Sequence, residues 1–409
     1  MSTPRTLLNV PPQALLLLAT GIVAQMGAAL VQQGVAIISL RIRSNMHLDL
    51  SQMGLLSSAT LAGVFVGMLF AGRLVDSRGP RWLLTRGVAA MAVFVVLAGL
   101  ITSYVPLLCV LFAIGVASAA VPLASSRSIF EGFRNSARGL VMSLRQTGVP
   151  IGGILAALLL PLALARLSLP LVWVGLALVL VLTSTIFFFH LPRHWQLHRG
   201  GGQSLKGLLP AIWPTLLSWM LVSGQYTVIA YIIPDLRANL GWTTALGGVG
   251  LAVAQVGGIT GRLMAGTLTD LVGGRRAPVL IALAFIAALA SLAVGLMPRG
   301  SGLILVFVVL FLLGLGTIGW SSTTNLWAAE CVPLARSGQA MSWPSAASFL
   351  GSALYPPLFG HVIDLTHRFG DAWFALALWL ALAGLIVAWL VATKRDLPHF
   401  AKTPAPLPG

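Results

Sequence analysis

Long apolar segments separated by short polar stretches run through almost the whole chain. A helix that crosses a membrane needs about 20 mostly apolar residues, and segments of that kind recur along the sequence. An even number of such helices places both ends of the chain on the same side of the membrane. We predict twelve spans, at 13–38, 52–75, 83–103, 106–131, 139–164, 168–190, 208–234, 245–269, 277–297, 303–329, 339–363 and 372–392.

The longest polar interruption divides these spans into two groups of six. It runs from Pro192 to Lys206 and contains several basic residues and a run of glycines. The predicted fold is therefore an all-α membrane protein with twelve transmembrane helices in two pseudo-symmetric six-helix bundles. The predicted parts are a first bundle at 1–190, a linker at 191–206, a second bundle at 207–395 and a tail at 396–409.

The composition supports a protein embedded in a membrane. Of 409 residues, 57% are hydrophobic and 8% are charged, with a mean hydropathy of +0.94, whereas soluble domains carry about 25% charged residues. Lys and Arg number 25 against 9 Asp and Glu. Most of these cations fall in the loops of one side, which the positive-inside rule assigns to the cytoplasm. We expect cytoplasmic termini, a location in the plasma (inner) membrane and no nucleic-acid partner.

A short loop motif occurs twice and indicates an internal duplication. Each copy has Gly, then Asp four residues on, Gly three later and Arg two later, and the copies are Gly72–Arg81 and Gly266–Arg275. They follow the second and the eighth predicted spans. Glu131 and Glu330 end the fourth and tenth spans, and each is followed at the same spacing by Gly and by Met-Ser. The two halves of the chain are therefore predicted to share one architecture.

Twelve spans, a basic central linker and this duplicated loop resemble the major facilitator superfamily over essentially the whole chain. The loop motif of that superfamily is Gly-x3-Asp-[Arg/Lys]-x-Gly-x-[Arg/Lys]-[Arg/Lys], and Ser77 and Leu271 stand where it has a base. The resemblance implies a secondary transporter with a substrate site near the midplane, at the interface of two repeats. It leaves the substrate open, because members of one superfamily carry very different molecules.

The repeated loops also supply a candidate conformational latch. A carboxylate at the C-terminal end of a helix is unfavourable unless a cation compensates it. We expect Glu131 to pair with Arg81, and Glu330 to pair with Arg275, so that one side of the protein is held closed in one state. The alternative is that these groups only anchor loops at the headgroup level. The latch residues are Gly72, Asp76, Arg81, Glu131, Gly266, Asp270, Arg275 and Glu330.

Arginines inside the predicted spans, without an acid near mid-span, indicate a site for an anion. Arg127, Arg145 and Arg262 should face protein or water, because a charge in the bilayer interior costs roughly 2.5–3.5 kcal/mol. A guanidinium can bind both oxygens of a carboxylate. Arg262 is the first candidate, because the monocarboxylate and oxalate/formate transporters of the superfamily are similar there, with a substrate-binding arginine on span eight. Pairing with Glu131 is an alternative role for Arg127.

Polar and aromatic residues near mid-span extend this candidate site. Each amide has an alternative role in hydrogen bonding between helices. Together these side chains favour a small amphipathic anion, such as an aromatic or branched carboxylate. The residues are Gln25, Gln32, Gln225, Tyr226, Gln255, Trp320, Asn325 and Trp343.

These observations predict a proton-coupled transporter of a small organic anion, a monocarboxylate, which acts as a monomer by alternating access. An exporter of hydrophobic drugs is the alternative, although its cationic-drug version needs an acid in the cavity. A transporter-like membrane sensor is a third possibility, which usually needs an additional domain. The sequence shows no phosphate-binding loop, nucleophile motif or cysteine cluster, so we expect no cofactor, no metal site and no enzyme activity.

Overall fold

The structure is a computed structural model that describes residues 12–132, 141, 144–191, 211–271, 275–332 and 337–393. Within these ranges the regular secondary structure is entirely helical. Eleven of the described helical segments are long and apolar enough to cross a membrane. The twelfth predicted span corresponds to α14 (Ser337–Thr366), a helix of 30 residues with three prolines in its interior. The predicted all-α membrane fold is confirmed.

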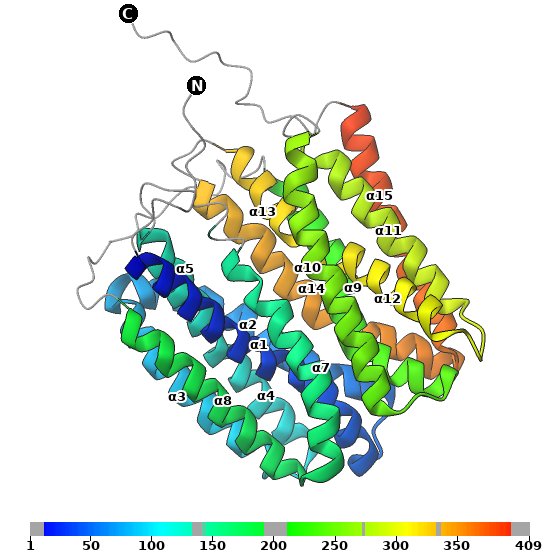
Figure 1. Cartoon of the computed structure of the whole chain (residues 1–409), viewed down its shortest axis with the longest axis horizontal. Helices are drawn as coiled ribbons and strands as arrows, with labels where there is room; N and C mark the ends of the chain where they lie inside the picture. The colour runs from blue at the N-terminus through cyan, green and yellow to red at the C-terminus, as the bar shows by residue number, and fades with distance from the viewer. Residues whose placement is uncertain are drawn as a thin grey trace, which may run out of the picture. The chain divides into compact units, whose positions relative to one another are not determined.

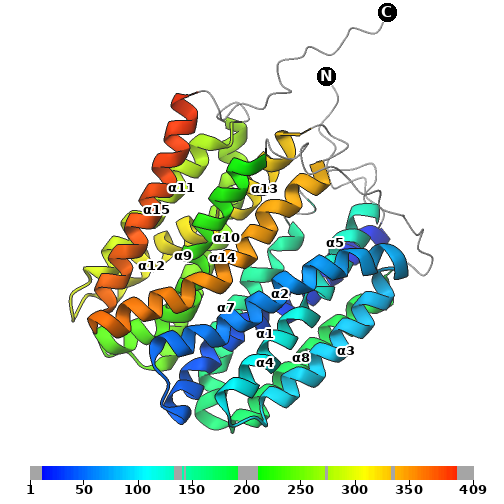
Figure 2. The ribbon, with the colours of Figure 1, turned by 180° about the vertical axis from the view of Figure 1, so that it is seen from behind.

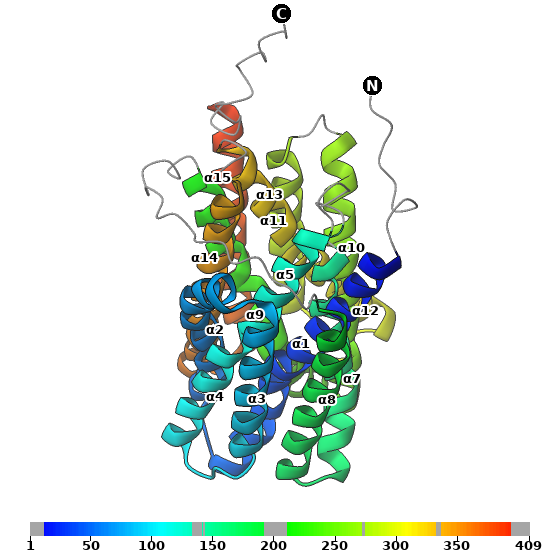
Figure 3. The ribbon, with the colours of Figure 1, turned by 90° about the vertical axis from the view of Figure 1, so that its left-hand side faces the viewer.

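The first compact unit contains residues Met1–Gly201 and Thr243–Ala252. In this unit α1 packs against α7 and α8, α2 packs against α4, and α3 packs against α8 and α4 (Figure 1, Figure 3). Its helices are α1 (Pro12–Met46), α2 (Leu50–Arg78), α3 (Pro80–Ala98), α4 (Tyr104–Ser118), α5 (Ala120–Gly132), α7 (Gly148–Arg166) and α8 (Leu169–His190).

The second compact unit contains residues Gly202–Trp242 and Val253–Gly409. In this unit α11 packs against α15, and α9 packs against α14 (Figure 2). Its helices are α9 (Ile212–Leu240), most of α10 (Thr244–Leu271), α11 (Ala277–Gly295), α12 (Leu303–Ile318), α13 (Ser321–Glu330), α14 and α15 (Phe369–Ala392).

Two spans that the sequence predicts as continuous helices are interrupted. The fourth span is α4 followed by α5, with Ala119 between them, and the tenth is α12 followed by α13. Pro122 accounts for the first interruption, because its ring clashes with the carbonyl of Ser118 and it donates no hydrogen bond. At the same place the hydroxyl of Ser118 donates to the carbonyl of Gly115 at 2.8 Å. The interruptions fall at corresponding places in the two halves.

Glycines bring equivalent helix pairs into backbone contact in both units. A Cβ atom on Gly115 of α4 would lie 1.9 Å from the carbonyl oxygen of Thr60 on α2. A Cβ on Gly314 of α12 would lie 1.7 Å from the carbonyl oxygen of Ala254 on α10. Small residues permit such close packing in membranes. The partner helices contribute glycines at matching positions, Gly63 and Gly257.

Candidate functional site

Arg145 is the most deeply buried of the three predicted arginines. It lies in the first unit just before α7, and its side chain is 6% exposed. Its Nη1 atom donates to Oε1 of Gln25 on α1 and to Oγ of Ser125 on α5, both at 3.2 Å. The Nε atom is buried and has no hydrogen-bond partner among the described residues. The guanidinium is thus a buried cation whose described partners are neutral. Its Nε–H group is available to donate one more hydrogen bond.

The helix that follows Arg145 is held tightly against α1. A Cβ atom on Gly152 would lie 2.4 Å from the carbonyl oxygen of Met26, so only glycine permits this spacing. The amide of Gln33 donates to the carbonyl of Val149 across the same contact at 2.9 Å. These contacts fix where Arg145 enters the interior of the unit.

The other predicted residues of the first unit divide between two places. The amide of Gln32 donates to the hydroxyl of Ser118 at 2.9 Å, beside the interruption between α4 and α5. Arg127 lies half-buried on α5. The structure therefore joins Gln25 to Arg145 and places Gln32 at the helix interruption.

Arg262 supports the interrupted tenth span in the second unit. Its Nε atom donates to the carbonyl oxygen of Ile318, the last residue of α12, at 3.1 Å. The last carbonyls of a helix lack partners within it, so this hydrogen bond satisfies one of them. Arg262 also interacts electrostatically with Tyr226 on α9. Arg262, the first candidate of the sequence analysis for binding substrate, thus makes a hydrogen bond that supports the end of α12.

The remaining predicted residues of the second unit are mostly buried among helices. Gln225, Gln255 and Trp320 are 7%, 1% and 1% exposed. The indole of Trp320 donates to the carbonyl of Thr317, three residues earlier in the chain, at 2.7 Å. Asn325 accepts a hydrogen bond from Ser345. Trp343 packs on an apolar cluster of Ala211, Ala328, Val332 and Ala340.

Comparison with known proteins agrees with this architecture. The sequence profile described as the Major Facilitator Superfamily matches residues 17–353 and 215–408. The chain belongs to the major facilitator superfamily. It is 28% identical over 370 residues to an uncharacterized MFS-type transporter of Mycobacterium tuberculosis, covering 88% of this chain and 81% of that one. Among solved structures, a bacterial homolog of the human lysosomal transporter Spinster has a TM-score of 0.75 at 15% identity, covering 95% of this chain and 99% of that one.

A second curated relative has a named substrate. The 3-(3-hydroxy-phenyl)propionate transporter of Escherichia coli is 29% identical over 364 residues, which cover 86% of this chain and 87% of that protein. Membership of the superfamily establishes a multi-pass membrane transporter rather than an enzyme. The predicted family, fold and absence of enzyme activity therefore stand.

The residues of the predicted latch are described in part. In the second unit, Nη2 of Arg276 lies 2.7 Å from Oε1 of Glu330, and Nε of Arg276 donates to both carboxylate oxygens at 3.3 Å. The sequence assigned this role to Arg275, which is exposed. In the first unit, Arg81 donates to the carbonyls of Leu191 and Phe188 at the end of α8. Gly72 lies in α2 and Gly266 in α10, and the side chains of Asp76, Glu131 and Asp270 are not described.

The sequence reasoning missed one buried acid in this transporter. The predicted seventh span stopped at residue 234 and left Asp235 outside it, whereas α9 continues to Leu240. The carboxyl is 3% exposed and accepts a hydrogen bond from Asn239, with the indole of Trp373 beside it. The spacing of Asp235 and Asn239, one helical turn apart, was the available signal.

Proposed function

We propose that this transporter carries a small aromatic carboxylate and that Arg145 binds the carboxylate group. The observation that carries the proposal is the burial of Arg145 with Gln25 and Ser125 as its described partners. A buried cation without a compensating acid is costly. An anionic substrate would supply the missing charge, and the free Nε donor allows a paired hydrogen bond to a carboxylate.

The named relative supports the chemical class of the substrate. A hydroxyphenyl propionate is an aromatic ring with a short carboxylate chain, and its E. coli transporter aligns over most of this chain. Such a substrate matches the amphipathic anion expected from the sequence. Gln25 is the neighbouring amide that we propose to contact the same carboxylate, because it already accepts from Arg145.

Arg262, Arg127 and the other polar residues are secondary candidates for the substrate site. Arg262 and Tyr226 interact with each other, so they form one candidate pair. Gln32, Gln225, Gln255, Trp320, Asn325 and Trp343 complete the proposed set. The Arg276–Glu330 pair is proposed to belong to the latch at the cytoplasmic side, with both termini on that side, in a monomeric protein of the plasma membrane.

Asp235 is our candidate for proton coupling. Its described polar neighbours are Asn239 and Trp373, and neither brings a positive charge. The helices packed on α9 are α12, α13, α14 and α15. Their titratable groups are Glu330 on α13, Tyr355, His361 and Asp364 on α14, and Asp371 on α15. Among the described residues of these helices, His361 is the one group that can become a cation, and it is exposed, as is Arg237 on α9 itself. Binding a proton would therefore remove the buried charge of Asp235.

Uptake by purified protein in proteoliposomes tests the substrate assignment. Labelled 3-phenylpropionate and 3-(3-hydroxyphenyl)propionate are supplied with and without an inward proton gradient. Arg145→Gln should lower uptake at least tenfold, because a hydrogen bond to a charged group is worth about 1.5–3 kcal/mol. Arg166→Gln is the matched control, since Arg166 is exposed at the other end of α7. Wild-type uptake by a folded Arg145→Gln protein would contradict the proposal.

A further inference from the structure

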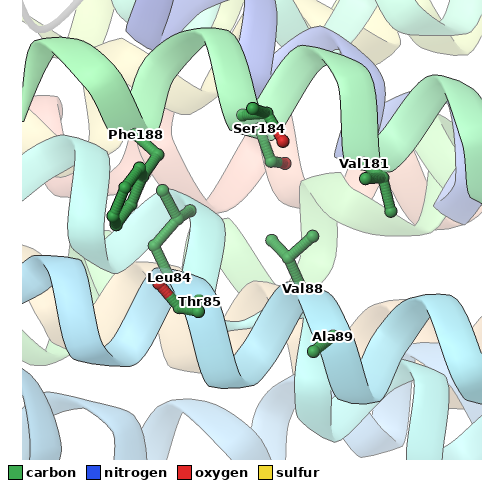
Figure 4. A pocket seen from close by; sticks show the side chains of 8 residues that line it. Leu84, Thr85, Val88, Ala89, Val181, Ser184 and Phe188 are labelled. Carbon is green, nitrogen blue, oxygen red and sulfur yellow. The ribbon is translucent and has the colours of Figure 1, made fainter.

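A groove of about 270 Å³ runs between α3 and α8 on the outside of the first unit. Figure 4 shows side chains of the two helices facing each other across it. The floor is formed by Leu84 and Val88 of α3 and Ser184 of α8, which are 1%, 8% and 3% exposed. The rim residues Ala89 and Val181 are exposed. The groove therefore opens away from the interior of the unit.

The surface around the groove is apolar and faces the bilayer. Val93 on α3, and Leu182 and Phe189 on α8, are 60%, 62% and 72% exposed. In a protein that crosses the membrane, an exposed face of this kind contacts lipid. The natural occupant of a groove in such a face is an acyl chain rather than water.

A polar group on the floor of the groove lacks a partner. The Oγ atom of Ser184 is buried and makes no hydrogen bond with a described residue. Ser184 lies six residues before His190, where α8 ends, so its depth along the helix axis is about 9 Å from that end. A hydroxyl at this depth lies below the headgroups, at the level where a glycerolipid carries its ester carbonyls.

The headgroup end of the groove is positively charged. The guanidinium of Arg81 lies over the ring of Phe188, a lining residue, at 4.7 Å from the ring centroid. Neither α3 nor α8 contains an acidic residue. The N-terminus of α3 lies at the same end, and its positive pole offsets the negative pole at the C-terminus of α8.

We propose that this groove is a binding site for one anionic glycerophospholipid. One acyl chain lies between α3 and α8, an ester carbonyl accepts a hydrogen bond from Ser184, and the phosphate lies at Arg81. Charge complementarity selects the headgroup, and the apolar groove selects for a long acyl chain. The site is separate from Arg145 and does not depend on the identity of the transported substrate.

Native mass spectrometry of the full chain tests the site. The protein is extracted in detergent and titrated with phosphatidylglycerol and with phosphatidylcholine of identical acyl chains. We expect one phosphatidylglycerol to bind at least tenfold more tightly than phosphatidylcholine. Arg81→Gln should remove this preference while leaving chain binding, and Ser184→Ala should weaken binding of both lipids.

Two phenylalanine variants test the location of the bound lipid. Ala89→Phe fills the groove from its rim and should lower phosphatidylglycerol binding at least tenfold. Val93→Phe is the matched control on the same helix, outside the groove, and should bind as the wild type does. Melting temperatures confirm that both variants are folded. Equal binding of the two headgroups by the wild type, or equal binding by the two variants, would show ordinary annular lipid and overturn the proposal.

Discussion

Arg276 and Glu330 form a bidentate ion pair in the second unit, with Nη2 and Oε1 2.7 Å apart. The pair joins the residue before α11 to the end of α13, and the side chains are 13% and 34% exposed. Planar, doubly hydrogen-bonded pairs are the stronger kind of charge contact. The ion pair links two spans at one end of the unit. Such a link is suited to a contact that forms in one conformation of a transporter and breaks in another.

We expect this pair to stabilise the conformation that the structure shows. A double-mutant cycle of Arg276→Gln and Glu330→Gln should give a coupling free energy on the order of 1 kcal/mol, reduced by salt. Thermal unfolding in detergent measures it. Arg275→Gln is the neighbouring control and should couple less strongly to Glu330→Gln. A larger coupling for Arg275 would return the role to the residue that the sequence favoured.

Cys331 offers a native probe of the same place. Burial, and next the charge of Glu330, raise the pKa of the Cys331 thiol to about 12. The thiolate is the reactive species, so in a Cys109→Ser background alkylation by iodoacetamide should be slow at pH 7 and rise about tenfold per pH unit towards 12. Glu330→Gln lowers the pKa and should speed the reaction at pH 8. A rate that levels off near pH 9 would contradict the assignment.

Gly314→Ala should destabilise the protein strongly. The added methyl would lie 1.7 Å from the carbonyl oxygen of Ala254, so α10 and α12 must separate, at a cost of about 1–3 kcal/mol. Gly175→Ala is the control, because nothing lies within 4 Å of its added Cβ. That variant should unfold at or above the wild-type temperature, since alanine is the better helix former. Equal melting temperatures for the two variants would exclude the close contact.

Asp235→Asn should separate transport from proton coupling. The variant keeps the size and the hydrogen bonding of the side chain and cannot bind a proton. We expect substrate exchange at equal pH to continue, while accumulation driven by a proton gradient falls at least tenfold. Asp371→Asn, in the first turn of α15, should respond to the gradient as the wild type does. Gradient-driven accumulation by Asp235→Asn would assign the coupling elsewhere.

Much of the fold could be predicted from the sequence because membrane spans depend on one strong signal, the length of an apolar segment. The end of α9 shows the limit of that signal. Leu240 ends the helix at a left-handed Gly241, six residues beyond the predicted boundary, and this extension carries Asp235 into the helix. Hydropathy marks where a chain becomes polar, whereas hydrogen bonding decides where a helix stops.

The candidate site was less predictable because neighbouring residues face different directions. Arg275 and Arg276 are adjacent, and hydropathy gives no sign that Arg276 forms the described ion pair with Glu330. Arg145 and Arg262 are both arginines inside predicted spans, yet one is linked to side chains and the other to a helix end. Pro122 did indicate the interruption of the fourth span. The span is apolar on both sides of this proline, so hydropathy alone predicts one continuous helix.

The glycine contacts also determine which parts of the protein can move independently. Because Gly115 and Gly314 leave no room between backbones, α2 with α4, and α10 with α12, cannot slide past each other without losing that contact. Each pair of helices should therefore move as one rigid body during transport. Spin labels placed on the two helices of a pair would keep a constant separation throughout the transport cycle. That separation would serve as the reference against which changes in other interhelical distances are measured.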